Sequence, residues 1–132
     1  MGAMSYLLDT HTFLWAAVDE AKLSINALTI VENIDSLLFV SAVSAYEIMY
    51  KHKLGKLPGY AYVAENYFAI LDKLRVNELP LRARHAHFAG KTEWEHRDPF
   101  DRLLAAQAAL DNLTIITNDL AFHDLSWLNV LW

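Results

Sequence analysis

The sequence alternates short, continuous apolar runs with longer segments of helical periodicity, and this alternation limits the fold more than any other feature. The apolar runs are too short for core helices and are apolar throughout, which is typical of strands buried on both faces of a sheet. Strands separated by helices pair in parallel, because a parallel crossover needs a dozen or more residues. We therefore predict an α/β fold, a three-layer α/β/α sandwich around a central parallel sheet of about five strands. The predicted strands are 5–9, 36–41, 75–81, 113–117 and 129–132.

The predicted helices lie between these strands and carry local start signals. Ser24 and Ser41 each precede a segment of helical periodicity and suit N-cap positions. Asp98 is a similar N-cap candidate, and Pro99 then occupies the first helical position, where a missing N–H costs nothing. The predicted helices are 10–18, 25–34, 42–54, 62–74, 82–93 and the helix that Asp98 opens, which runs to Leu110.

Length and composition are those of one domain. A chain of 132 residues buries roughly two thirds of its unfolded surface in a single core. We expect one domain over 1–132, with residues 1–3 an addition ahead of a native start at Met4. Hydrophobic residues make up 55% of the chain, above the usual ~45–50%, so we expect a partner to cover some apolar surface. The net charge of −5 argues against a broad, sequence-independent nucleic-acid binder but permits an enzyme with a local basic patch.

The residue types that are missing exclude several classes of protein. The chain has no cysteine, which excludes disulfides and thiolate metal sites and fits a reducing compartment. No apolar run approaches the ~18–20 residues of a membrane span, and no basic-then-apolar leader is present. We therefore expect a cytoplasmic protein without a membrane partner.

Four acidic residues are predicted to meet at one edge of the sheet. Asp9 ends the first strand and Asp119 follows the fourth strand by two residues. Ligands of open parallel sheets gather beyond the carboxyl ends of the strands. Glu47 lies about a turn and a half into the helix after the second strand, and Asp101 lies in the first turn of the helix before the fourth. If the first and fourth strands are neighbours, Asp9 and Asp119 share an edge over which the two helical acids lean.

Such a group of carboxylates suits hydrolytic metal chemistry. Like charges a few ångströms apart resist ionisation unless cations compensate. Oxygen ligands without cysteine favour Mg²⁺ or Mn²⁺ over zinc. Divalent metal lowers the pKa of a bound water and neutralises charge on a phosphate and its leaving oxygen. We therefore interpret the four acids as a site for phosphodiester hydrolysis.

Each acid also has a purely structural interpretation. Asp9 fits the N-cap of the first helix, Asp119 fits the cap of the following "LAFHDL" turn, and Glu47 fits a solvated helix surface. For Asp98 a capping role is sufficient, and Asp101 is favoured near the positive end of the helix dipole. These interpretations do not explain why two strand-terminal and two helix-borne acids occur together in one small domain.

Five collinear motifs, "LLDTHTFLW", "SAVSAYEI", "KHKLGKLP", "HRDPFDRLLAAQA" and "IITND", resemble the PIN-domain family. The similarity is specifically to the small VapC-like ribonuclease toxins of bacterial toxin–antitoxin pairs, and it covers nearly the whole chain. It implies an α/β/α PIN fold and a divalent-metal nuclease site. The catalytic and metal-binding residues that it implies are Asp9, Glu47, Asp101 and Asp119, with Thr10 and Thr117 as hydroxyls that support the acids and Asp98 as either a further ligand or only a helix cap.

Two positions depart from the family pattern. Glu93 and Glu95 precede "HRDPFDR" where similar toxins are more apolar or basic, which puts the local substrate contacts in doubt. Tyr46 occupies a position where tryptophan is common, and we expect this difference to affect packing only.

The resemblance implies an endoribonuclease that acts as the toxin of a toxin–antitoxin pair. Such a protein would be a homodimer, inhibited by a small antitoxin that covers an apolar groove and blocks the acidic site. The alternatives are a PIN-like RNA-processing nuclease without an antitoxin and a PIN-like binding module without catalysis. The presence of all four acids favours catalysis. An aspartyl-phosphate phosphatase would need a second aspartate where His11 stands.

The remaining polar residues have weaker functional interpretations. Arg97 and Arg102 flank the predicted site and are candidates for RNA phosphate contacts, although Arg102 fits equally well as the ion-pair partner of a carboxylate. The cations of 51–56 bind phosphate or simply complement a helix C-terminus. His85 and His87 would point more than a right angle apart on a helix, which disfavours zinc. The four tryptophans are assigned to the core or an interface because none lies in a basic–aromatic alternation.

Overall fold

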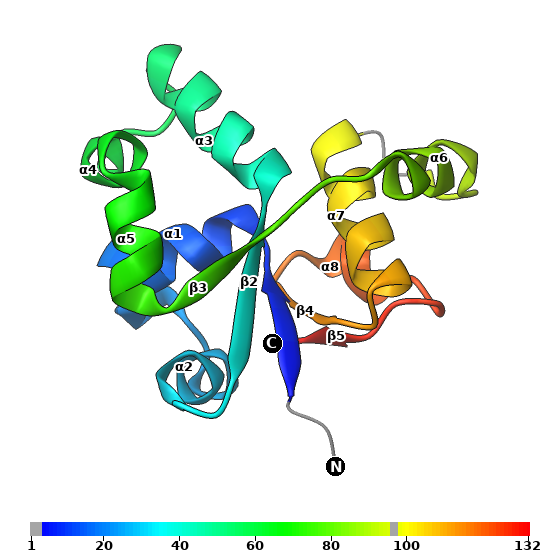
Figure 1. Cartoon of the computed structure of the whole chain (residues 1–132), viewed down its shortest axis with the longest axis horizontal. Helices are drawn as coiled ribbons and strands as arrows, with labels where there is room; N and C mark the ends of the chain where they lie inside the picture. Colours follow the sequence, from blue (N-terminus) through cyan, green and yellow to red (C-terminus); the bar gives the residue numbers. More distant parts are fainter. Residues whose placement is uncertain (1–3, 96–97) are drawn as a thin grey trace.

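A five-stranded parallel sheet with helices on both faces forms the centre of the molecule (Figure 1). The structure is a computed structural model that describes residues 4–95 and 98–132. The strand order is β3-β2-β1-β4-β5, and every neighbouring pair is parallel. The predicted α/β architecture is confirmed. The strands are β1 Ser5–Leu8, β2 Leu37–Ser41, β3 Val76–Leu79, β4 Thr114–Ile116 and β5 Val130–Leu131.

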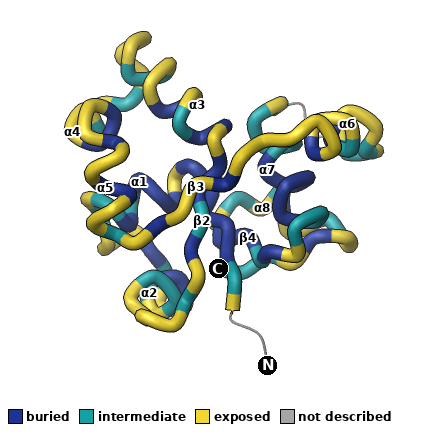
Figure 2. The backbone as a smooth tube through the Cα atoms, in the orientation of Figure 1, coloured by how far each residue is buried: buried dark blue, intermediate teal, exposed yellow. Residues whose placement is uncertain are grey.

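The strands are apolar throughout because both faces of the sheet are covered. Leu7 and Ile115 pair in register and face one core cluster, whereas Leu8 and Ile116 face the other. Successive side chains of a strand point to opposite faces, so each strand contributes to both clusters. All four side chains are fully buried. In Figure 2 the middle of the sheet is buried, while α2 and α6 are largely exposed.

The first layer of helices packs on the face of the sheet that carries Leu8. Its N-caps are predicted correctly, since Ser24 accepts from the Ala27 N–H and Ser41 from the Val43 N–H. Gly55 follows the third helix at φ +72°, a left-handed conformation that favours glycine. The elements here are α1 Thr10–Val18, the 3-10 turn η1 Glu20–Lys22, α2 Ile25–Glu32, α3 Ala42–Lys53, α4 Ala61–Glu65 and α5 Tyr67–Leu74.

The second layer covers the opposite face. Leu104, Ala105 and Ala108 of α7 and Phe122 of α8 pack with Leu7 in its core. Helix α6 packs in turn against α7 (Figure 1). The elements are α6 Ala83–Lys91, α7 Pro99–Leu110 and α8 Leu120–His123. In the described part of the chain, no helix is both long enough and apolar enough to cross a bilayer.

Several predicted boundaries are wrong. The helix predicted over 25–34 ends at Glu32, and Ile34 lies outside it with 74% of its surface exposed. The helix predicted over 62–74 is divided into α4 and α5 at Asn66, whose backbone leaves helical geometry at φ −120°. The Asn66 side chain donates to the Tyr62 carbonyl oxygen, which also accepts from the Asn66 backbone N–H, so a local side-chain hydrogen bond accompanies the change in backbone geometry. The turn expected after Asp119 is the short helix α8.

Candidate active site

A cavity of about 260 Å³ lies beyond the carboxyl ends of β1 and β4. These two strands are direct neighbours, as the predicted meeting of Asp9 and Asp119 requires. Glu47 on α3 and Asp101 in the first turn of α7 line the same cavity. The four acids are therefore brought together as predicted, and their catalytic roles stay a prediction. The lining residues are Asp9, Thr10, His11, Glu47, Lys51, Asp98, Asp101, Asn118 and Asp119.

Asp9 is both the N-cap of α1 and a wall of the cavity. Its Oδ1 accepts from the Thr12 N–H at 2.7 Å, and its Oδ2 accepts from the Thr117 hydroxyl. Only 8% of the residue is exposed. Burial raises the pKa of the Asp9 carboxyl above its ordinary value, although the hydrogen bonds from Thr117 and Thr12 act to lower it. The capping and functional interpretations of Asp9 are therefore compatible.

Glu47 is buried, so its interpretation as a solvated helix residue is wrong. Its Oε1 accepts from the Thr10 hydroxyl at 2.7 Å, and the Thr10 hydroxyl also lies 2.9 Å from the Ser44 hydroxyl. Its Oε2 lies 2.5 Å from Lys51 Nζ, one turn further along α3. Lys51 thus places a positive charge directly in the wall of the acidic cavity. The supporting role of Thr10, which the resemblance implied, stays a prediction.

Thr117 connects two acids of the cavity. Its hydroxyl donates to Asp9 Oδ2 and accepts from the Asp119 N–H at 3.0 Å, and the residue is fully buried. Asp119 in turn caps α8 by accepting from the Ala121 N–H at 3.0 Å. Thr117 thus contacts two of the acids, and its supporting role in the site stays a prediction. We did not predict the similar position of Thr12, whose hydroxyl donates to the Ile116 carbonyl oxygen at 2.8 Å and anchors α1 to β4.

Asp98 caps α7 as predicted and also lines the cavity. Its Oδ1 accepts from the Phe100 N–H at 2.9 Å and from the Asp101 N–H at 3.4 Å. Asp98 and Asp101 are both half-buried and both border the cavity. A carboxylate offers about four acceptor positions, so a capping bond does not prevent Asp98 from contacting a ligand as well.

Arg102 binds backbone carbonyl oxygens near the end of α6. Its guanidinium donates to the carbonyl oxygens of Trp94 at 2.5 Å, Thr92 at 2.7 Å and Ala89 at 3.0 Å. These bonds tie α7 to the C-terminal end of α6, and Arg102 is not one of the residues that line the cavity. Its contact with an RNA phosphate stays a prediction. Arg97, the other arginine proposed for phosphate binding, lies outside the described residues.

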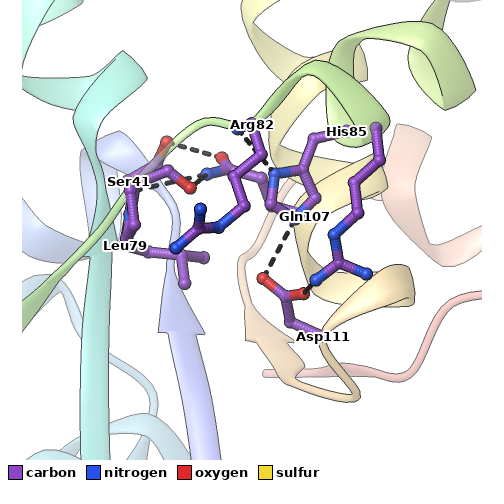
Figure 3. A network of polar contacts seen from close by, with 8 residues as sticks. Ser41, Leu79, Arg82, His85, Gln107 and Asp111 are labelled. Carbon is purple, nitrogen blue, oxygen red and sulfur yellow. Dashed lines mark hydrogen bonds and ion pairs between the residues drawn. The ribbon is translucent and has the colours of Figure 1, made fainter.

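A buried amide links the two helices that carry acids of the cavity (Figure 3). Gln107 of α7 accepts from the Ser41 hydroxyl at 2.6 Å and donates to the carbonyl oxygens of Leu79 and Pro80. Ser41 is itself the N-cap of α3. This network fixes α7, with Asp101, relative to the start of α3, with Glu47. Sequence analysis missed it, and its only signal is one amide in the otherwise apolar run "LLAAQAAL".

His85 has a structural role rather than a metal-binding one. Its ring is buried, with Nδ1 accepting from the Arg82 N–H at 2.9 Å and Nε2 lying 3.0 Å from Asp111 Oδ2. Asp111 also receives a hydrogen bond from Arg84 at 2.8 Å. Figure 3 shows this second network beside that of Gln107. It joins the start of α6 to the end of α7, in agreement with the sequence argument against zinc.

The residues of the cavity fit a hard divalent cation by their chemistry. The acidic donors are all oxygens, and the burial of Asp9 disfavours its charged form unless a cation is near. Within residues 4–95 and 98–132, no three acidic or histidine side chains lie close enough together to form a metal centre on their own. Mg²⁺ usually keeps several waters and uses only one or two carboxylates besides substrate oxygens. Acids spread around the cavity walls therefore suit Mg²⁺ better than an ion that needs a closed protein cage.

Comparison with known families identifies the class of the protein. The family model of the PIN domain matches residues 6–128. The chain therefore belongs to the PIN-domain family. No curated protein sequence matches it significantly.

Solved structures with the same fold include chains of VapBC complexes, and one of these is described as a member of the VapBC family of toxin–antitoxin systems. A chain of the VapBC2 complex from Rickettsia felis, solved with a DNA fragment from its promoter, is 23% identical with a TM-score of 0.70, and the match covers 97% of this chain and 98% of that one. A chain of VapBC-1 from nontypeable Haemophilus influenzae is 20% identical with a TM-score of 0.71, and 97% of each chain is covered. A chain of FitAcB from Neisseria gonorrhoeae is 19% identical with a TM-score of 0.64, and 96% of each chain is covered. At these identities the similarity establishes the fold.

Proposed function

We propose that the protein is a metal-dependent endoribonuclease that acts as the toxin of a toxin–antitoxin pair. The observation that carries the proposal is the cavity at the carboxyl edge of the sheet, where Asp9, Glu47, Asp101 and Asp119 converge beside Lys51. Membership of the PIN-domain family and the shared fold with chains of VapBC and FitAcB complexes support it.

The side chains of the cavity have distinct parts in this proposal. One or two carboxylates of the set Asp9, Glu47, Asp101 and Asp119, together with waters and substrate oxygens, would hold Mg²⁺ or Mn²⁺. The ion would supply a water of lowered pKa and neutralise charge on the phosphodiester. Thr117 holds the carboxylate of Asp9 in one orientation, because its hydroxyl is itself fixed by the Asp119 N–H. Lys51 is positioned to attract the RNA phosphate, and its Nζ also contacts the buried carboxylate of Glu47.

An apolar groove on α3 fits the proposed antitoxin. Met49 and Phe68 are 48% and 66% exposed at its border, and such exposed apolar residues mark interaction surfaces when they cluster. A short amphipathic segment of an antitoxin would bury them. We also propose a homodimer, on the basis of the resemblance. The groove is lined by Ala45, Ile48 and Met49 of α3 and by Ala64, Glu65, Tyr67 and Phe68 of α4 and α5.

The test is cleavage of single-stranded RNA by the purified chain with Mg²⁺, Mn²⁺, Zn²⁺ or EDTA. We expect cleavage with Mg²⁺ or Mn²⁺, none in EDTA, and a lower rate with Zn²⁺, because the acidic ligands are all oxygens. Glu47→Gln should abolish cleavage and retain the fold, which separates this activity from that of a contaminating nuclease. Cleavage at an undiminished rate in EDTA would falsify the metal-dependent mechanism. Binding of RNA without cleavage under every metal condition would favour the alternative of a binding module.

A further inference from the structure

Two tyrosines on the outer surface of α3 stack on one another beside the acidic cavity. The ring centroids of Tyr46 and Tyr50 lie 5.5 Å apart, and the ring planes are only 8° from parallel. Tyr46 also contacts the ring of Phe100 on α7, at 5.9 Å between centroids. Despite these contacts the two tyrosines are 58% and 46% exposed. We refer to Tyr46, Tyr50 and Phe100 as the aromatic rim.

The aromatic rim adjoins residues that line the cavity, although its three members do not line the cavity themselves. Glu47 and Lys51 line the cavity and define the direction in which α3 faces it. At 3.6 residues per turn, Tyr50 lies only about 60° around the helix from Glu47, and Tyr46 about 100°. Phe100 directly precedes Asp101, and its N–H donates a hydrogen bond to the Asp98 carboxylate. Both of these aspartates line the cavity. The rim therefore joins the two walls that carry Glu47 and Asp101.

We propose that the aromatic rim binds an unpaired nucleobase of the RNA, next to the phosphodiester bond that is cleaved. This inference rests on the proposed function. An RNA whose phosphate lies in the cavity has to continue across its border in both directions. On the side where α3 meets α7 it meets exposed aromatic rings, on which a base of any sequence can stack.

The charges around the rim favour a nucleotide over an apolar protein segment. Lys51 adjoins Tyr50 in the chain and faces the cavity, so it would attract the phosphate of a nucleotide whose base stacks on the ring. The apolar groove proposed for the antitoxin lies further around α3. Its residue Ile48 lies about 100° from Glu47 in one direction around the helix, whereas Tyr50 and Tyr46 lie about 60° and 100° from Glu47 in the other direction. A base in a duplex is already stacked and paired, so the rim would also select single-stranded RNA.

The experiment combines a missing ring with a missing base. The starting material is a short RNA that the unchanged protein cleaves at one bond. A set of variants of this RNA is then made, each with a single abasic site at one of the nucleotides next to that bond. Cleavage kinetics are then measured with the unchanged protein, with Tyr50→Leu and with Tyr50→Phe. Leucine keeps apolar surface but removes the π-face, and phenylalanine restores it. Tyr62→Leu is the matched control, because Tyr62 is 66% exposed on α4 and is not one of the residues that line the cavity.

We expect Tyr50→Leu to raise KM by about 5- to 150-fold with little change in kcat, the range that corresponds to one base–aromatic stack. Tyr50→Phe and Tyr62→Leu should behave like the unchanged protein. One abasic RNA should show a similar rise in KM with the unchanged protein and no further rise with Tyr50→Leu, because the ring and the base then form a single interaction.

Three outcomes would overturn the inference. The first is that every abasic RNA is cleaved like the intact RNA, and the second is that the effects of the ring and the base simply add. The third combines two results: light scattering shows that Tyr50→Leu changes the oligomeric state of the RNA-free protein, and the effect of the abasic site on KM persists in this variant. The rim would then be a contact between copies of the chain. If the unchanged protein cleaves no RNA at all, the proposed function itself fails. This outcome differs from a failure of the aromatic-rim inference, because without a cleaved bond there is no position at which to place the abasic sites.

Discussion

Asp9 accepts hydrogen bonds through both carboxylate oxygens while most of its surface is withdrawn from water. The burial raises the pKa of Asp9, which means that the ionised carboxylate is unfavourable in the folded chain without a cation. An acid with a raised folded-state pKa holds its proton more tightly in the folded than in the unfolded chain. Its contribution therefore lowers the free energy of unfolding as pH rises from its unfolded pKa, near 3.8, through the higher folded-state pKa.

Asp9→Asn removes this pH-dependent cost and keeps an oxygen that can accept from the Thr12 N–H. We expect the metal-free variant to be at least as stable as the unchanged protein at neutral pH and to lose that advantage below about pH 4. Thermal melts in EDTA across this range provide the measurement. A large loss of stability at neutral pH would instead mark Asp9 as mainly a structural cap. RNA cleavage by Asp9→Asn should be absent in either case.

The two aspartates at the start of α7 are predicted to separate in function. Asn caps a helix about as well as Asp, so Asp98→Asn should leave stability nearly unchanged, whereas Asp98→Ala should cost ~0.5–2 kcal/mol. Asp101→Asn keeps the shape of the side chain and removes its charge, so it should retain the fold and lose Mg²⁺ affinity and cleavage. Urea unfolding, Mg²⁺ titration and RNA cleavage on these variants check the assignment. If Asp98→Asn is inactive and Asp101→Asn is active, the two roles are reversed, and if both are inactive the site uses five acids.

At the scale of elements, α7 is held by side chains that reach beyond it at both ends. Arg102 binds carbonyl oxygens at the end of α6, and Gln107 binds Ser41 and the end of β3. A buried polar group without a partner costs about 1–3 kcal/mol. Any shift of α7 that broke the hydrogen bonds of Gln107 would therefore lower the free energy of unfolding. The position of Asp101 at the cavity depends on how α7 packs.

Gln107→Leu tests the network directly. Leucine matches the apolar surroundings but leaves the Ser41 hydroxyl and the Pro80 carbonyl oxygen without their observed partner. We expect a loss of about 1–3 kcal/mol in the free energy of unfolding, or somewhat more if both groups stay dry. Asn77→Leu is the matched control, because the Asn77 amide also donates to a backbone carbonyl oxygen, that of Leu38, but lies on an exposed edge strand. Equal effects of the two substitutions in urea unfolding would refute the special weight of Gln107.

What the sequence predicted well is what local chemistry determines. Ser24, Ser41 and Asp98 mark helix starts because an N-cap involves only the next two or three residues. The division of 62–74 at Asn66 was missed because the apolar periodicity continues across it. The partners of Gln107 and Arg102 were missed for a different reason. Ser41 lies 66 positions from Gln107 in the chain, so no local pattern records the contact.

The candidate site shows the same division. The four acids were predicted because each lies at a strand end or near a helix start, where the parallel sheet brings them to one edge. The burial of Glu47, and with it the ion pair to Lys51, follows from how α3 packs against α1 and was not predicted. Lys51 had been only one of several cations in 51–56.

At the scale of the whole molecule, a divalent cation should stabilise the fold. A ligand that binds only the folded chain raises the free energy of unfolding by about 2.7 kcal/mol at a hundred times its Kd. We expect Mg²⁺ and Mn²⁺ to raise Tm by several degrees at neutral pH, and Asp101→Asn to abolish most of the shift while its own metal-free Tm changes little. Differential scanning calorimetry with and without EDTA is the measurement. An equal shift in the unchanged protein and in Asp101→Asn would place the bound ion elsewhere.

The pairing of β4 with β1, the middle strand of the sheet, has a consequence for the timing of activity. Tyr6 of β1 pairs with Thr114 of β4, so the sheet joins two segments that are far apart in the chain. Asp119, the last of the four acids along the sequence, comes three residues after β4 ends at Ile116. A nascent chain still held by the ribosome before residue 119 emerges lacks both a sheet neighbour for β1 and one wall of the cavity. If the protein is a ribonuclease toxin, the translation machinery that makes it is thus not exposed to the finished active site until Asp119 has emerged.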